Sequence, residues 1–247
     1  MVFQHCSIGG KVYKGDPDLA EDDVIKAEPI AGPGTLNGPS SAESSTAGSN
    51  GSPTPPVADR INRSEPVLPH FRDATLKSDL EDAVAADRSS ENANQARLLN
   101  GFFTVLALCH TVLTGVNPQT GAIEYKAQSP DEAALVQAAA DVGFVFRGRD
   151  RETLNLQTPF SENTEKYELL NILEFTSARK RMSVVLRKMD GEDERLFLLT
   201  KGADNVIFER LKAGSEDLKN STEKDLDAFA NEGLRTLTLA YKVIQGE

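Results

Sequence analysis

A long run of proline, glycine and serine interrupts the chain and limits where a folded core can form. Between residues 29 and 56, 17 of the 28 residues are Pro, Gly or Ser, and none is aromatic. Such a stretch buries too little apolar surface to offset the entropy that is lost on ordering. We therefore predict that residues 28–63 are largely disordered and that the fold is built from the residues on either side.

Regular apolar patterns flank this run. Residues 2–13 place β-branched and aromatic residues around a Gly9-Gly10 pair, which predicts two short strands joined by a turn. Residues 71–87 carry apolar residues at near-helical spacing among charges, which predicts a surface helix. We divide the chain into N-terminal strands (1–16), an acidic to Pro/Gly/Ser-rich insertion (17–95) and a globular body (96–247).

Two helices are predicted at the start of the body. Apolar residues at i, i+3 and i+4 over residues 98–113 indicate a buried helix that ends at Gly115. His110 within it is expected to be a core histidine whose hydrogen bonds are satisfied. Ser129, followed by a proline, begins the second helix, and Glu132 lies at the spacing of a capping box.

A glycine at position 143 ends the second helix. Beyond it, the pattern changes to short runs of Val, Leu, Ile and Phe. The predicted strands span residues 144–146, 154–156, 167–175, 182–187, 196–200 and 236–243, and two further helices span 204–211 and 216–231. An Asp190-Gly191 pair is typical of a hairpin turn. Hairpins with grouped helices favour an α+β fold, in which an antiparallel β-sheet is flanked by helices.

Charge and cysteine content exclude several functions. The net charge of −11 makes nucleic acid a poor partner, because it offers no bulk attraction for phosphate. Two cysteines and three histidines suit neither a disulfide framework nor a thiolate zinc site, and they indicate a reducing compartment. No apolar run reaches the roughly 20 residues of a membrane span, so we expect a soluble chain. Neither common glycine-rich phosphate loop is present, and we assign no catalytic residue and no metal site.

Four ordered segments are more specific than packing alone requires. They read SPDEAALV at 129–136, EFTSARKRMS at 174–183, KGAD at 201–204 and EGLRTL at 232–237. Together they resemble the nucleotide-binding domain of the P-type ATPases, and most closely the type IV branch, the phospholipid flippases. The upstream LALCHTV fits as well, and the opening MVFQHCSIGG resembles the strand that follows the phosphorylated Asp in these pumps. The resemblance covers the body and the opening segment and leaves out the insertion.

The resemblance implies a site that binds ATP without a glycine-rich loop. Phe175 matches the ring that stacks on adenine, and Ser177 matches a polar contact two residues later. Lys180 and Lys201 match cations beside the phosphates, and the glycine after Lys201 would let a ligand approach the backbone. Arg235 matches the arginine that pairs with the phosphates, for which its planar fork is suited.

Several of these residues also have a plainer interpretation. Phe175 could be an inward core residue, Lys201 a solvated lysine at a strand end, and Lys180 part of a solvated basic face. Glu132 has two roles that compete for one carboxylate. It could complete the capping box with Ser129, or it could face the adenine amino group as the matching residue does in the family.

The resemblance further implies a parent pump. ATP would dock on this domain, with Mg²⁺ in the full-length pump, and its γ-phosphate would pass to an Asp of the phosphorylation domain. That Asp and its D-K-T-G-T surroundings are absent from this sequence, so we expect the chain to bind ATP and not to hydrolyse it. The implied partners are the phosphorylation and actuator domains, while the membrane region handles the phospholipid. We expect a monomeric chain on the cytosolic face of a eukaryotic membrane, of the Golgi, an endosome or the cell surface.

Two alternatives stay open. The chain could be a regulatory or interaction module in which the Ser-rich residues 28–63 dock a partner, so that their deletion abolishes function and spares ATP binding. It could also be the nucleotide-binding domain of a cation-pumping P-type ATPase. The strings RKRMS and SPDEAALV favour the lipid-transporting branch.

Overall fold

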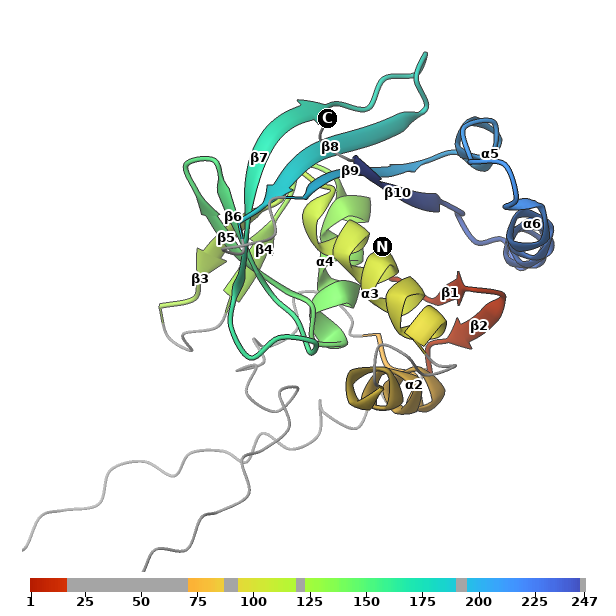
Figure 1. Ribbon diagram of the computed structural model, residues 1–247, viewed down its shortest axis with the longest axis horizontal. Coiled ribbons are helices and arrows are strands. Elements are labelled where there is room, and N and C mark those ends of the chain that lie inside the picture. The colour runs from red at the N-terminus through yellow and green to blue at the C-terminus, as the bar shows by residue number, and fades with distance from the viewer. Residues whose placement is uncertain (17–70, 87–92, 119–122, 190–194, 245–247) are drawn as a thin grey trace, which may run out of the picture.

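The computed structural model describes residues 1–16, 71–86, 93–118, 123–189 and 195–244 (Figure 1). The disorder predicted for residues 28–63 and the turn predicted at Asp190-Gly191 lie outside the described residues. The strands and helices given below lie within them.

A six-stranded antiparallel sheet forms the centre of the domain, in the order β10-β9-β8-β7-β6-β5 (Figure 1). Its strands are β5 (Val145–Asp150), β6 (Thr153–Gln157), β7 (Glu165–Leu173), β8 (Arg181–Lys188), β9 (Leu196–Gly202) and β10 (Thr238–Ile244). Neighbours in the sheet are also neighbours in the chain, and within the described residues helices intervene only between β9 and β10. The prediction of an α+β fold built on an antiparallel sheet is confirmed.

Helices α3 (Ala93–Leu108) and α4 (Pro130–Asp141) pack together on one face of this sheet (Figure 1). Helix α2 (Ala74–Ala85) lies against α3, and α5 (Asp204–Phe208) and α6 (Glu216–Asn231) lie beyond β10. The core fills the layer between the helices and the sheet and includes Leu99, Phe103, Val136, Leu186 and Leu199. Among the described residues, no helix combines the length and the apolar character that a membrane crossing requires.

The first helix of the body ends earlier than predicted. It ends at Leu108, and the residues predicted to continue it form β3 (Leu113–Val116), which pairs antiparallel with β4 (Ile123–Lys126). Leu113 is 68% exposed, so it does not extend the buried face of the helix. The apolar run therefore extends past the helix, and its last residue, Leu113, pairs with Lys126 of β4.

The opening residues form a hairpin of β1 (His5–Ile8) and β2 (Lys11–Lys14), as predicted. Tyr13 is fully buried, and its hydroxyl donates to Asp79 of α2 at 2.7 Å and accepts from Gln95 of α3 at 3.3 Å. The hairpin thereby joins two helices that lie about 60 to 80 positions further along the chain.

Further contacts of the hairpin reach α6. His5 and Lys14 both lie 3.0 Å from the carboxylate of Glu232, directly after the last residue of that helix. Ser7 donates to Asp225 within α6 at 2.5 Å. The hairpin therefore contacts α2 and α3 on one side and α6 on the other.

The Tyr13 hydroxyl gives a test of this packing. Tyr13→Phe should lower the free energy of unfolding by about 1–2 kcal/mol, because a buried hydrogen bond to a charged group is lost while the ring is kept. Urea unfolding followed by circular dichroism measures this. Tyr241→Phe, at a tyrosine that is 44% exposed, is the matched control and should be neutral. Equal effects of the two substitutions would contradict the role given to the Tyr13 hydroxyl.

Candidate functional site

Chain segments that are distant in sequence meet around the first turn of α4. Glu132 Oε1 lies 2.9 Å from Nζ of Lys201, the second-last residue of β9. Asp131, the preceding residue, lies 2.7 Å from Nη1 of Arg235, between α6 and β10. Two cations that were predicted to bind phosphate are thus held by neighbouring carboxylates of one helix.

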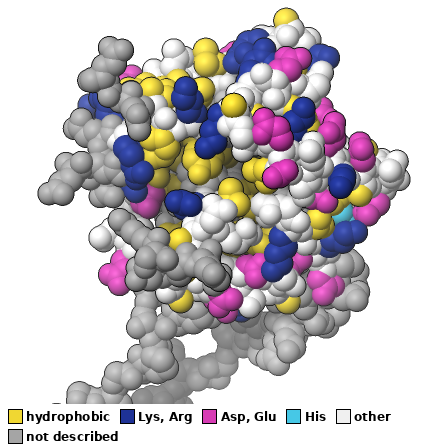
Figure 2. All heavy atoms as spheres, turned by 45° about the vertical axis from the view of Figure 1, so that its right-hand side comes forward, with side chains coloured by type: hydrophobic (Ala, Val, Ile, Leu, Met, Phe, Trp, Pro, Cys, Tyr) yellow, Lys and Arg dark blue, Asp and Glu magenta, His cyan; other side chains and the backbone are white. Residues whose placement is uncertain are grey.

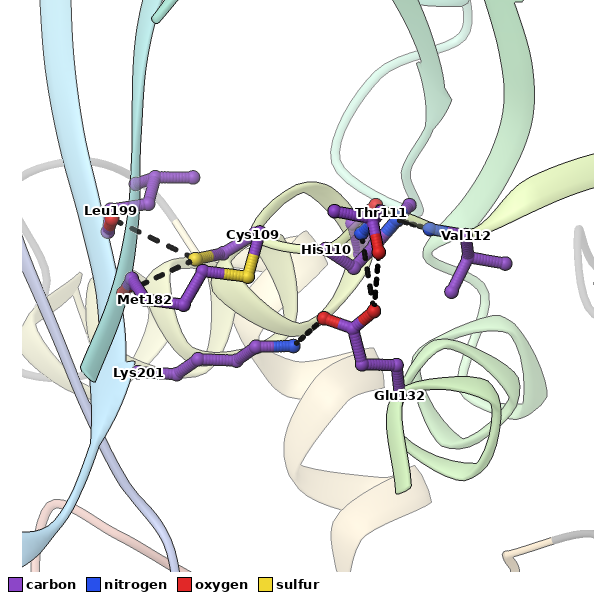
Figure 3. Close-up of polar contacts among 9 residues, drawn as sticks. Cys109, His110, Thr111, Val112, Glu132, Met182, Leu199 and Lys201 are labelled. Carbon is purple, nitrogen blue, oxygen red and sulfur yellow. Dashed lines mark hydrogen bonds and ion pairs between the residues drawn. The ribbon is translucent and has the colours of Figure 1, made fainter. Parts of the chain in front are cut away.

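The Glu132–Lys201 pair is mostly removed from solvent. The side chains are 16% and 8% exposed, respectively. The second carboxylate oxygen, Oε2, accepts from the hydroxyl of Thr111 at 2.8 Å and from its backbone N–H at 3.4 Å (Figure 3). Partial burial acts to raise the pKa of Glu132, but the Lys201 ammonium and the hydrogen bonds outweigh it, so the pKa lies below its usual value. The carboxylate is therefore ionised at neutral pH.

These contacts bear on one of the two roles predicted for Glu132, the capping box. Ser129 is the N-cap of α4, as predicted, but its side chain makes no capping hydrogen bond in the described structure. The Glu132 carboxylate turns toward Lys201 and Thr111 instead (Figure 3). The capping-box interpretation of this pair is therefore wrong, and the helix start is stabilised by Pro130 and by the acidic first turn.

Lys201 is buried, so its interpretation as a solvated lysine is also wrong. The residue is 7% exposed, and Gly202 follows it at the end of β9. A Cβ on Gly202 would lie 2.5 Å from Cβ of Arg181 and 2.6 Å from the carbonyl oxygen of Lys180. The close approach of β8 is therefore enough by itself to require a glycine at this position.

Phe175 lies in the connection between β7 and β8. Strand β7 ends at Leu173, two residues earlier than predicted, and Phe175 is 62% exposed. The interpretation of this ring as an inward core residue is wrong. The Arg179 guanidinium donates to the carbonyl oxygens of Leu173 at 2.9 Å and Glu174 at 2.7 Å, which fixes the turn that carries the ring.

Ser177 and Lys180 are exposed on the same connection. Lys180 has a left-handed backbone, with φ of +49°, which a residue with a side chain rarely adopts. Its N–H donates to the Thr176 carbonyl at 2.8 Å, and its own carbonyl accepts from Ala203 N–H at 3.0 Å. The connection is therefore hydrogen-bonded to Ala203, two residues after Lys201.

Arg235 is 77% exposed, and its ion pair with Asp131 lies at the surface. An exposed ion pair contributes little to stability, so this guanidinium can exchange its partner at low cost. Figure 2 shows hydrophobic and basic side chains interspersed around a hollow in the face of the molecule that it displays.

The residues that end α3 are held by buried polar contacts (Figure 3). His110 is buried, its Nε2 lies 2.7 Å from the Ala107 carbonyl oxygen, and its Nδ1 accepts from Val112 N–H at 3.0 Å. Burial lowers its pKa to about 4, so the ring is neutral at physiological pH and carries its proton on Nε2. The prediction of a satisfied core histidine is confirmed.

Cys109 joins this helix end to the sheet. Its thiol lies 3.7 Å from the Leu199 carbonyl oxygen of β9 and 3.9 Å from that of Met182 in β8 (Figure 3). Burial raises the pKa of this thiol to about 12, which makes it an inert packing group. Across the described residues, no group of three or more His, Cys, Asp or Glu side chains could hold a metal ion.

Sequence reasoning missed Asp131 and Thr111. Both lie in segments that were singled out, SPDEAALV and LALCHTV, but only the packing of α3 against α4 shows where their side chains point.

Comparison with known proteins gives consistent matches. Residues 98–247 match the family described as P-type ATPase, cytoplasmic domain N. Probable phospholipid-transporting ATPase 11 of Arabidopsis thaliana is 46% identical over 153 residues, which are 60% of this chain and 12% of that protein. Phospholipid-transporting ATPase ID of Homo sapiens is 46% identical over 146 residues, 59% of this chain and 12% of that protein. Phospholipid-transporting ATPase IC of Xenopus tropicalis is 50% identical over 143 residues, 58% of this chain and 11% of that protein. The chain thus spans a small part of the length of these relatives.

The buried His110 predicts a specific pH dependence. Because its folded pKa of about 4 lies below the ordinary value of 6.5, the unfolded chain binds more protons between these values. Its contribution to stability is complete above about pH 6.5 and is lost as the pH falls toward 4. Between pH 7 and pH 5, the free energy of unfolding should fall by about 2 kcal/mol more in the wild type than in His110→Gln. Urea unfolding at the two pH values measures this, and parallel declines would contradict it.

Proposed function

Because the chain belongs to the P-type ATPases, as a cytoplasmic N domain of their type IV branch, we propose that it binds ATP for a phospholipid-transporting pump. The observation that carries this proposal is the exposed ring of Phe175, on a turn that is hydrogen-bonded to the chain just after the buried Lys201. An aromatic ring left in solvent on a fixed turn is suited to stacking on a nucleobase.

The neighbouring groups fit the rest of the nucleotide. The Glu132 carboxylate is ionised and its oxygens have lone pairs beyond those that Thr111 and Lys201 use, so it can accept from the adenine amino group. Lys180 and Arg235 are exposed cations that can turn to the phosphates, while Ser177 offers a hydroxyl close to Phe175 in the chain. Lys201 would bind a phosphate by giving up part of its contact with Glu132.

The expected affinity is modest. One stacked base and a few partly exposed charged contacts, less the cost of association, leave about 4–6 kcal/mol, a dissociation constant between millimolar and tens of micromolar. Both Arg235 and Lys201 must first leave a carboxylate, which lowers the gain further.

We place this domain in a larger pump. Residues 1–16 and 96–247 would form the nucleotide-binding domain, with residues 17–95 inserted and α2 packed back onto α3. The domain would position ATP, with Mg²⁺ on its phosphates, for transfer to an Asp of the phosphorylation domain. The actuator domain would be a further partner, and the membrane region would handle the phospholipid, at the cytosolic face of the Golgi, an endosome or the cell surface. This chain alone would bind ATP without hydrolysing it.

An amide NMR titration with ATP tests the proposal, since there is no Trp to serve as a fluorescence probe. We expect saturable shifts near Phe175, Lys201 and Arg235, and an affinity about 5- to 100-fold weaker in Phe175→Ala, because base stacking is lost. Val116→Ala, at a hydrophobic residue that is 69% exposed on β3, is the matched control and should bind like the wild type. Absence of any saturable shift at about 10 mM ATP would overturn the proposal.

The strained Lys180 gives a second test. Lys180→Gly should leave the free energy of unfolding within about 0.5 kcal/mol, because relief of the left-handed backbone offsets the greater freedom of glycine in the unfolded chain. It should nevertheless weaken ATP binding about 3- to 10-fold, because a charged contact is lost.

Arg151→Gly is the control for Lys180→Gly, because Arg151 has a similar φ of +54° in the turn between β5 and β6. It should match Lys180→Gly in stability and the wild type in ATP affinity. Equal loss of affinity in both variants would show that Lys180 makes no contact with the nucleotide.

A further inference from the structure

We propose that Thr111 is a positioning residue of the nucleotide site, which fixes the Glu132 carboxylate from the side opposite Lys201. The inference rests on the proposed function and adds to it a residue for which the sequence assigned no role.

Thr111 directs two donors at one oxygen. Its hydroxyl and its backbone N–H both reach Oε2 of Glu132, while Oε1 faces Lys201 (Figure 3). The residue itself is exposed, so its side chain is not needed to fill the core. The contact with Glu132 is the feature that requires a hydroxyl at this position.

The two hydrogen bonds from Thr111 keep the Glu132 carboxylate in place if Lys201 moves toward a phosphate. A glutamate side chain has three rotatable bonds, and here its carboxylate is held at both oxygens. When a phosphate draws the Lys201 ammonium away, the hold on Oε1 weakens, and the two donors of Thr111 still keep Oε2 in place. They also favour the ionised carboxylate, which is the form that accepts from an amino group.

The residues on either side hold Thr111 rigidly. The two ring nitrogens of His110 bind the Ala107 carbonyl oxygen, near the end of α3, and the Val112 N–H. The ring thereby closes the turn that contains Thr111. Cys109 contacts carbonyl groups of β8 and β9, the strand that carries Lys201. The end of α3 is therefore held against β9, the strand that carries Lys201. Thr111 and Lys201, which both bind the Glu132 carboxylate, are thus positioned by the same strand.

The test compares Thr111→Val, which keeps the shape and removes the hydroxyl, with Thr111→Ser, which restores it. Two quantities are measured, the pKa of the Glu132 carboxyl by carbon-detected NMR and the affinity for ATP by amide NMR titration. Thr111→Val should raise that pKa and weaken ATP binding about 3- to 10-fold, because a hydrogen bond to a charged group is lost. Thr111→Ser should return both to wild-type values.

Thr222→Val is the matched control, since its hydroxyl donates at 2.8 Å to a carbonyl within α6, away from Glu132. It should change neither quantity. An unchanged pKa and an unchanged affinity in Thr111→Val would overturn the inference. If Thr111→Val fails to fold, the comparison of Thr111→Ala with Thr111→Ser decides in the same way.

The outcomes separate this inference from the proposed function. Failure of the wild type to bind ATP would overturn the function. The pKa of Glu132 would then still show whether Thr111 holds the carboxylate, a rise in Thr111→Val supporting that role and no change refuting it.

Discussion

The ion pair between Glu132 and Lys201 is the contact on which the arrangement of the site depends. It joins the first turn of α4 to the last residues of β9, and both side chains are largely withdrawn from water. Removing one partner of such a pair leaves an uncompensated charge, which costs about 3–5 kcal/mol, whereas the intact pair adds little net stability. The pair therefore contributes more to fixing the relative positions of α4 and β9 than to the net stability of the fold. It fixes the position of the acidic first turn of α4 relative to the end of β9.

The sheet explains why the other segments arrive at the same place. Lys201 is paired with Met182 of β8 on one side and with Leu239 of β10 on the other. The connection that carries Phe175 enters β8 just before Met182, and the segment that carries Arg235 enters β10 just before Leu239. The pairing of β9 with β8 and with β10 thus brings the segments that carry Phe175, Lys201 and Arg235 to one end of the sheet. The long excursion through α5 and α6 returns to that end without disturbing the order of strands.

The sequence predicted most of the fold, because strands, turns and helix starts leave local patterns. It predicted both ends of α4 from Pro130 and from the glycine at position 143, whose φ is +96°. It placed the end of α3 too late, because Leu113 continues the helical spacing of apolar residues and only pairing with β4 shows that it belongs to a strand. The contacts of Glu132 could not be predicted from the sequence, for a related reason. A capping box is a contact within one turn, whereas Thr111 and Lys201 lie 21 and 69 residues away, and nothing local reports such contacts.

The pairing of Arg235 with Asp131 has a consequence for exchange at the site. If a phosphate binds there as proposed, the carboxylate it displaces stays nearby on α4, ready to recapture the guanidinium. Departure of the ligand would then proceed through partner replacement, without a bare cation at any step. The bound nucleotide would then have a short residence time, as the proposed role in a pump that turns over its ATP would need.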